Sequence, residues 1–145
     1  MSKHVYTCQV RFSDVDVYGH VNNVRYLEYY QEARLAALSA LDRGADGGMP
    51  GHEPRGRLSL VVARVVVDYR RPIVFRPEPY LVTTWVEGTG RSSFELASAI
   101  TDSGEPSGRP LSTARATLVR FDLAAQKAHP LTAEDRAVLD ALAPP

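Results

Sequence analysis

The sequence has a single cysteine in its 145 residues, Cys8, so a disulfide within the chain is excluded. No Cys/His cluster has the spacing of a zinc site, and we expect neither a metal nor another cofactor. No segment reaches the roughly 18 consecutive apolar residues of a transmembrane helix. The opening residues, MSKHVYTCQV, lack the apolar stretch of a signal peptide. These absences predict a cytoplasmic protein that does not associate with a membrane.

An excess of charge of either sign is also missing. Lys+Arg and Asp+Glu each total 17, so no basic footprint for a nucleic acid and no basic amphipathic run for a membrane surface is present. The 44% hydrophobic content is ordinary for a globular protein. A chain of this length is enough for one core, and we expect a single domain over residues 1–145.

The N-terminal segment changes its hydrophobic period. Tyr6, Cys8, Val10 and Phe12 alternate with polar residues, which predicts a strand with one buried face between residues 4 and 12. A stripe at three- and four-residue steps then predicts a long helix. Its members are Leu27, Tyr30, Ala33, Ala37, Leu38 and Leu41.

Short polar residues set the expected limits of this helix. Asn22 or Asn23 can cap its N-terminus, and Arg43 followed by Gly44 is typical of a C-terminus. About 20 residues at 1.5 Å each give a helix of roughly 30 Å, long enough to cross a small domain. The glycine- and proline-rich residues 44–56 predict a loop.

The rest of the chain predicts four strands and a short helix. The strands are expected at residues 60–70, 80–88, 92–100 and 111–122, with a core of the domain over about 5–122. In the first of them, one face is expected to carry Val61, Ala63, Val65, Val67 and Tyr69. Thr132 and Asp135 have the spacing of a capping pair for a helix at about 132–142. Short connections favour antiparallel pairing, so the fold class is α+β, with one long helix against one antiparallel sheet.

Residues 14–23, DVDVYGHVNN, concentrate polar groups at the expected helix start. Free backbone N–H groups and the positive end of the helix dipole meet there, and they can bind an anion or stabilise the oxyanion of a carbonyl under attack. Asp16 is then placed as a nucleophile or general base, and His20 could exchange protons near neutral pH. Composition alone favours a plainer alternative, a polar loop that caps the helix. Asp14 fits a role in loop structure.

Residues 11–34, RFSDVDVYGHVNNVRYLEYYQEAR, resemble the hotdog-fold acyl-CoA thioesterases of the 4-hydroxybenzoyl-CoA thioesterase family. Residues 61–75 and the hairpin at 90–96 are similar to later segments of the same family, in the same order. The resemblance implies five antiparallel strands wrapped around a long central helix. It also implies a homodimer or homotetramer with the active site between protomers, an acyl-CoA substrate and thioester hydrolysis as the reaction.

The resemblance also implies roles for particular residues. Asp16 corresponds to the catalytic aspartate, which attacks the thioester or activates a water, and the backbone N–H of Asn23 holds the thioester carbonyl. The expected substrate-binding residues are Tyr18, Gly19, His20, Val21 and Asn22 in the loop, and Arg91, Ser92 and Ser93 in the hairpin. The basic residue of the hairpin is expected near the nucleotide of the acyl-CoA.

Alternatives remain open at this point. A second hotdog branch uses a glutamate on the central helix, for which Glu28 and Glu32 are candidates, although pairing of a helical glutamate with Arg25 is the plainer expectation. The turn FRPEP at 75–79 departs from the Gly-Asp that is usual in the family. An enoyl-thioester hydratase or dehydratase of the same fold is the second hypothesis, and its His-Phe-Pro-Gly or Asp-x-Asn-Pro-x-His signature is absent. A non-catalytic acyl-CoA binding protein is the third.

Overall fold

The structure, a computed structural model, describes residues 3–41, 58–103 and 108–144. The elements are β1 (His4–Cys8), a 3-10 helix η1 (Phe12–Asp14), α1 (Asn23–Leu41), β2 (Leu58–Tyr69), β3 (Tyr80–Thr89), β4 (Ser93–Asp102), β5 (Ser112–Asp122), β6 (Lys127–Ala128) and α2 (Ala133–Ala141). The expected order of strand, long helix, four strands and short helix is confirmed. The expected helix stop at Arg43 and Gly44 and the loop at 44–56 lie outside the described residues.

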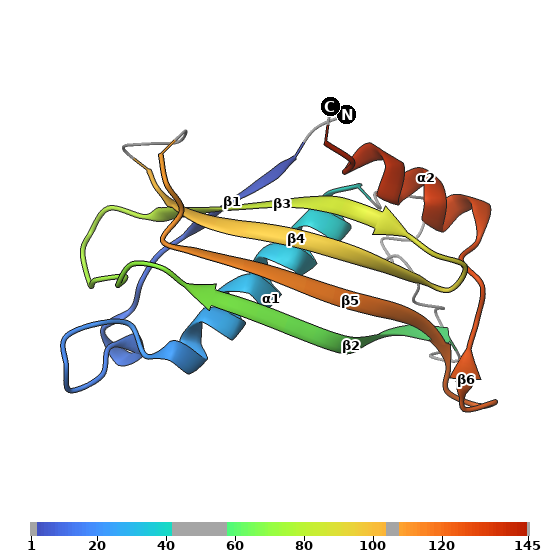
Figure 1. Cartoon of the computed structure of the whole chain (residues 1–145), viewed down its shortest axis with the longest axis horizontal. Helices are drawn as coiled ribbons and strands as arrows, with labels where there is room; N and C mark the ends of the chain where they lie inside the picture. The colour runs from blue at the N-terminus through green and yellow to red at the C-terminus, as the bar shows by residue number, and fades with distance from the viewer. Residues whose placement is uncertain (1–2, 42–57, 104–107, 145) are drawn as a thin grey trace.

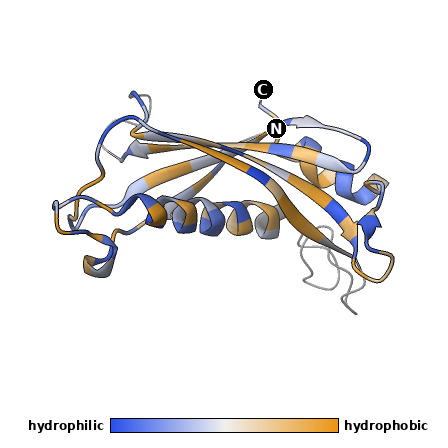
Figure 2. Cartoon of the chain, turned by 60° about the horizontal axis from the view of Figure 1, so that its bottom comes forward, coloured by the Kyte–Doolittle hydropathy of each residue, from blue (hydrophilic) through white to orange (hydrophobic). Residues whose placement is uncertain are grey.

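The main strands form one antiparallel sheet in the order β1-β3-β4-β5-β2, and the two-residue β6 pairs with β5. The helix α1 crosses behind this sheet, and α2 lies at one end of it (Figure 1). In Figure 2 the sheet arches over α1, so α1 covers one face of the sheet. This is the hotdog arrangement, and the expected α+β fold is confirmed. None of the described helices is long and apolar enough to span a membrane.

Aromatic and small residues of α1 form the face that packs against the sheet. Tyr26, Tyr29 and Tyr30 are buried, and Ala33 and Ala37 are fully enclosed. Small side chains in the middle of the helix let its backbone approach the strands closely, while the tyrosines fill the wider space near its start. Leu27 was expected in this stripe, but its side chain is 45% exposed, so that expectation is wrong.

The first strand is shorter than the alternation predicts. β1 ends at Cys8, and the buried side chains of Cys8 and Val10 follow the expected period. Phe12 breaks the pattern because it opens the 3-10 helix η1 and is 81% exposed, stacked edge-to-face on Phe75 with ring centroids 6.0 Å apart. The expectation that Phe12 belongs to the buried face is therefore wrong.

A bulge changes the faces of β2. Its pairing with β5 shifts between Val62 and Arg64, so Ala63 is the extra residue. Val61 pairs with Val119, whereas Val65 pairs with Ala116, and these two partners point to opposite faces of β5 because they are three residues apart. The expected single face for Val61 and Val65 is therefore wrong.

The helix α2 closes the far end of the core. Thr132 caps its N-terminus: its hydroxyl accepts from the Asp135 N–H, and the Asp135 carboxylate accepts from the Thr132 N–H, which confirms the expected capping pair. Leu139 and Leu142 are 1% exposed and pack with Leu38 of α1. Near them, Arg120 of β5 forms a buried ion pair with Asp135, with 2.7 Å between Nη1 and Oδ2.

Candidate active site

The loop between η1 and α1 is a small closed turn. The Asp16 N–H donates to the His20 carbonyl at 3.0 Å, and the Gly19 N–H donates to the Asp16 carbonyl at 3.1 Å. One carboxylate oxygen of Asp16 accepts from the Tyr18 N–H at 2.9 Å. Gly19 has a φ of 85°, a left-handed conformation that glycine adopts without strain. These bonds fix the position of Asp16, and its second carboxylate oxygen has no hydrogen-bond partner among the described residues.

Asp14 has a different role from its neighbour Asp16. Its side chain is 0% exposed and accepts from the Tyr29 hydroxyl at 2.6 Å and from the Arg11 N–H at 3.1 Å, with the Arg11 guanidinium at 3.2 Å. Its main chain takes part as well, because its carbonyl accepts from the Asn22 N–H. Asp14 therefore holds the two ends of the loop together, which confirms the expected structural role.

The surroundings of Asp14 make the stability of the protein depend on pH. Burial favours the neutral carboxyl, but the hydrogen bonds from Tyr29 and Arg11 and the charge of Arg11 outweigh it and hold the pKa of Asp14 below its ordinary value of 3.8. The unfolded chain therefore binds a proton first as the pH falls, so stability is full above about pH 4 and is lost below it. We expect Asp14→Asn to flatten the fall of unfolding free energy by up to about 1.4 kcal/mol per pH unit below pH 4.

Urea unfolding at closely spaced pH values between 2.5 and 7, followed by circular dichroism, measures this slope. Asp140→Asn, which removes an exposed carboxylate of α2, is the matched control and should keep the wild-type slope. Equal slopes for the Asp14 variant and the wild type below pH 4 would contradict the assigned role.

The start of α1 leaves one donor open. The Asn22 side chain accepts from the Val24 N–H at 3.2 Å, and the Asn22 carbonyl accepts from the Arg25 N–H at 2.9 Å. Asn22 is therefore the capping residue, one of the two that the sequence offered. For the N–H of Asn23, no acceptor is found within the described parts of the chain. A helix of 19 residues thus presents a free N–H and the positive end of its dipole at this point.

A groove of about 500 Å³ runs beside this helix start. It is lined by Asp16, Tyr18, His20, Val21 and Asn23 from the loop and the helix, together with Tyr26, Tyr69, Arg70, Arg71 and Pro72. Five of the residues expected at the site thus line one groove. A free N–H at a helix start and a carboxylate in one groove are the kinds of group that acyl transfer uses.

Tyr69, at the end of β2, was expected only as a strand residue, and it is one of the groove residues that the sequence did not assign to the site. Its hydroxyl donates to the Asn23 carbonyl at 3.0 Å, and its ring meets that of Tyr26 edge-to-face with centroids 4.8 Å apart. Tyr69 thereby attaches the first turn of α1 to the sheet. Tyr69 lies next to Arg70 and Arg71, whose N–H groups both donate to the Leu111 carbonyl.

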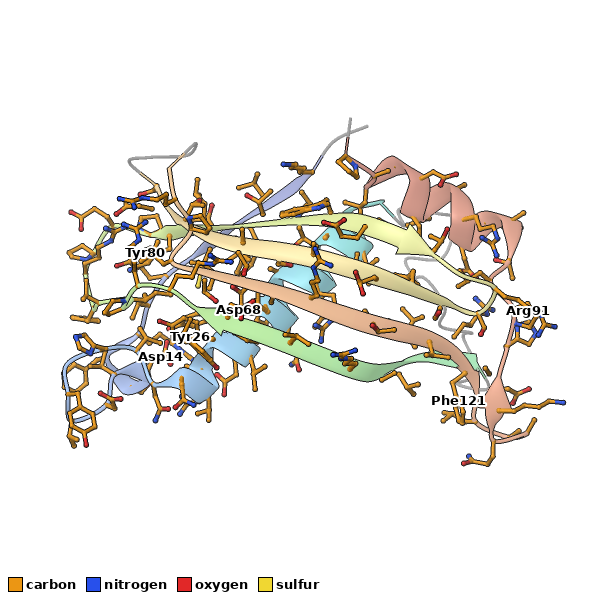
Figure 3. All side chains as sticks on the ribbon, in the orientation of Figure 1. Asp14, Tyr26, Asp68, Tyr80, Arg91 and Phe121 are labelled. Carbon is orange, nitrogen blue, oxygen red and sulfur yellow. The ribbon has the colours of Figure 1, made fainter. Side chains whose placement is uncertain are left out.

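The expected hairpin residues and the glutamates of α1 lie elsewhere in the chain. Arg91 lies at the opposite end of the sheet from Asp14 (Figure 3), and Ser92 and Ser93 adjoin it. Glu28 and Glu32 line a separate groove between α1 and β1, and Glu28 pairs with Arg25 at 2.7 Å as expected for a solvated helix face. In the portion that the structure describes, no three His, Cys, Asp or Glu side chains are grouped to hold a metal ion.

Comparisons with known proteins identify the family of the chain. The chain is 36% identical to the long-chain acyl-CoA thioesterase FadM of Escherichia coli strain K12 over 132 residues, which cover 91% of this chain and 93% of the relative. A thioesterase of Thermus thermophilus, crystallised with coenzyme A and Zn, superposes with a TM-score of 0.72 at 30% identity and covers 95% of this chain and 92% of its own.

The fold itself has a higher TM-score with a 1,4-dihydroxy-2-naphthoyl-CoA thioesterase from Synechocystis. The TM-score is 0.82 at 21% identity, over 99% of this chain and 100% of the other. The family model of the thioesterase-like superfamily matches residues 10–141, from just after the first strand through the last helix. The chain therefore belongs to the thioesterase-like superfamily.

Proposed function

We propose that this protein hydrolyses the thioester bond of an acyl-CoA to a free carboxylic acid and coenzyme A, with Asp16 as nucleophile or general base. The observation that supports this most directly is the groove lined by both Asp16 and Asn23, whose N–H has no acceptor among the described residues. The similarity to thioesterases that act on or bind CoA compounds supports the class of substrate.

The chemistry follows from these two groups. The thioester carbonyl oxygen accepts from the Asn23 N–H, and the dipole of α1 stabilises the negative charge that grows on that oxygen. Asp16 either attacks the carbonyl carbon or takes a proton from a water that attacks it. The C–S bond then breaks, and coenzyme A leaves as a thiolate that takes up a proton. In the nucleophilic route, water afterwards hydrolyses the mixed anhydride on Asp16.

The first test is direct. The purified protein is incubated with short-, medium- and long-chain acyl-CoAs and with aromatic acyl-CoAs, and thiol release is followed with a chromogenic disulfide. We expect thiol release well above the rate without protein for at least one class. Hydration of crotonyl-CoA without thiol release would instead favour the hydratase hypothesis, and binding without turnover would favour a non-catalytic acyl-CoA binding protein.

The assembly that we propose is a homodimer built on β2. In the described part of the chain β2 pairs only with β5, so the other edge of a 12-residue strand is open. Val62, Val65 and Tyr69 of this strand are 47%, 37% and 50% exposed. A long, open and apolar edge strand needs cover, and antiparallel pairing with the β2 of a second copy about a two-fold axis supplies it.

This pairing would also complete the site. β2 spans roughly 40 Å at about 3.3 Å per residue, with the groove at its Tyr69 end and the β3–β4 hairpin beside its Leu58 end. Antiparallel pairing places the Leu58 end of one copy beside the Tyr69 end of the other. The hairpin residues expected to bind substrate, which lie far from Asp16 within one protomer, then approach the groove of the partner. A dimer of such dimers would be the homotetramer.

Lysines introduced on the open edge of β2 test whether the dimer forms through this strand. The double variant Val62→Lys/Val65→Lys would place four lysines in the interface, and we expect it to sediment as a monomer and to lose most of the hydrolytic activity. Val5→Lys is the control, because Val5 is 52% exposed on β1, the opposite edge of the sheet. Sedimentation velocity measures the outcome, and an unchanged dimer in the double variant would rule out assembly through β2.

A further inference from the structure

The turn between β3 and β4 is held by residues that follow it in the sequence. We call residues Gly90–Ser92 the hairpin tip. Nη2 of Arg136, on α2, donates to the Gly90 carbonyl at 3.0 Å and lies 3.4 Å from the Arg91 carbonyl. The Leu131 N–H donates to the Arg91 carbonyl at 2.9 Å, and the Arg120 N–H donates to the Ser92 carbonyl at 2.8 Å. Every carbonyl of the hairpin tip therefore has a donor.

The N–H groups and side-chain donors of the hairpin tip differ from its carbonyls. Over the described residues, no acceptor is found for the N–H groups of Arg91 and Ser92, for the Ser92 hydroxyl or for the Arg91 guanidinium. The side chain of Arg91 is exposed and points away from the body of the sheet (Figure 3). The tip thus has its carbonyls occupied and offers N–H donors, a hydroxyl and positive charge to the solvent. Such a set suits an anion with several oxygens, above all a phosphate.

Arg136 contacts two of the three carbonyls of the hairpin tip. Both carbonyls are reached by one guanidinium nitrogen, Nη2, which carries two N–H donors. The backbone that carries Arg136 is held in place, because Leu139 of α2 and Leu142 just after it pack in the core. The tip itself is tight: the Gly90 N–H donates to the Ser93 carbonyl at 2.7 Å, and a Cβ at Gly90 would lie 3.1 Å from the Ser93 hydroxyl oxygen.

We propose that Arg136 is a positioning residue, which fixes the hairpin tip as the site that binds the phosphate groups of the acyl-CoA, with Arg91 in contact with them. The inference rests on the proposed function, which supplies a phosphorylated substrate. It gives α2 a part in substrate affinity, although α2 contributes no residue to the groove beside Asp16.

Paired substrates test this inference. We expect Arg136→Met to raise the KM for an acyl-CoA about tenfold with kcat unchanged, because a charge-assisted contact is weakened before the chemical step. The KM for the matching S-acyl-N-acetylcysteamine, a thioester without phosphate groups, should not change. Arg136→Lys should give an intermediate KM and keeps the test valid if the methionine variant fails to fold. Arg115→Met, which removes an exposed arginine of β5, should leave both substrates unaffected.

A double variant shows whether Arg136 acts by positioning Arg91 or by its own contact with the substrate. If Arg136 acts through Arg91, then Arg136→Met should have little further effect on the KM in a protein that already carries Arg91→Met. Independent, multiplicative effects would overturn the positioning role, as would a loss of kcat or equal effects on the two substrates.

Titration calorimetry with coenzyme A itself keeps the inference distinct from the proposed function. Weaker binding of coenzyme A by Arg136→Met, in a protein that hydrolyses no acyl-CoA, would reject the proposed function and retain the phosphate site. Normal hydrolysis, with KM and coenzyme A affinity unchanged by the substitution, would reject the phosphate site and retain the proposed function.

Discussion

Asp16→Asn should lower kcat for acyl-CoA hydrolysis at least about 100-fold and leave the KM nearly unchanged. An amide can neither attack a thioester carbonyl nor take a proton from water at neutral pH, so both routes open to Asp16 are lost. The fold of the loop should survive. The oxygen of the new side chain can still accept from the Tyr18 N–H, which bonds to Asp16 at 2.9 Å in the native protein.

Glu28→Gln is the matched control for this substitution. Glu28 is the carboxylate that the second hotdog branch offers on the central helix, but it lies in another groove, where it pairs with Arg25 and Arg11. We expect its variant to keep wild-type kcat. Steady-state kinetics on the two variants, with circular dichroism to verify folding, decides between the carboxylates. Full activity of Asp16→Asn together with a large loss in Glu28→Gln would reverse the assignment.

Arg120→Met should lower the free energy of unfolding by about 3 to 5 kcal/mol. Arg120 and Asp135 are 5% and 8% exposed, and removal of the guanidinium leaves a buried carboxylate without its cation. The loss is large against the total stability of a small domain, and it corresponds to a melting temperature lower by roughly 10 °C. Thermal melting and urea unfolding measure it.

Two companion variants show whether the buried charge is the cause. In Arg120→Met/Asp135→Asn both charges are gone, yet the amide oxygen can still accept from the Thr132 N–H at the start of α2, so most of the loss should be recovered. Arg115→Met breaks an exposed ion pair with Glu95 of the neighbouring strand and should cost less than about 1 kcal/mol. Equal losses in Arg120→Met and Arg115→Met would show that burial of the pair does not govern its contribution.

Local patterns predicted the elements of this fold well. The change of period after residue 12 indicated α1, and the Thr132/Asp135 pair indicated α2, because helix stripes and caps depend on residues close in sequence. The bulge at Ala63 was not predictable from β2 alone. An extra residue is defined only by the pairing with β5, and the alternating valines on either side of it look the same with and without the shift.

The candidate site was predictable only on its loop side. Asp16 and Asn23 belong to one local stretch with helix-start chemistry, whereas Tyr69 donates to the Asn23 carbonyl from 46 residues away. No spacing rule links such distant residues. The exposed Phe12 was assigned to a buried face because the alternation of β1 continues through the residues where η1 bends the chain away. The pairing of Glu28 with Arg25, by contrast, needed only the helical repeat.

The register of the sheet determines when the protein can fold during synthesis. β1 pairs only with β3, where His4 lies opposite Thr84, and β2 pairs with β5, where Leu58 lies opposite Asp122, among the strands that the structure describes. Until those later strands leave the ribosome, α1 has no sheet to cover its tyrosines. Closing such long loops makes folding slow relative to helical domains of the same size. The groove beside Asp16, which needs both the loop and the end of β2, is therefore assembled late, and the apolar face of α1 stays uncovered until then.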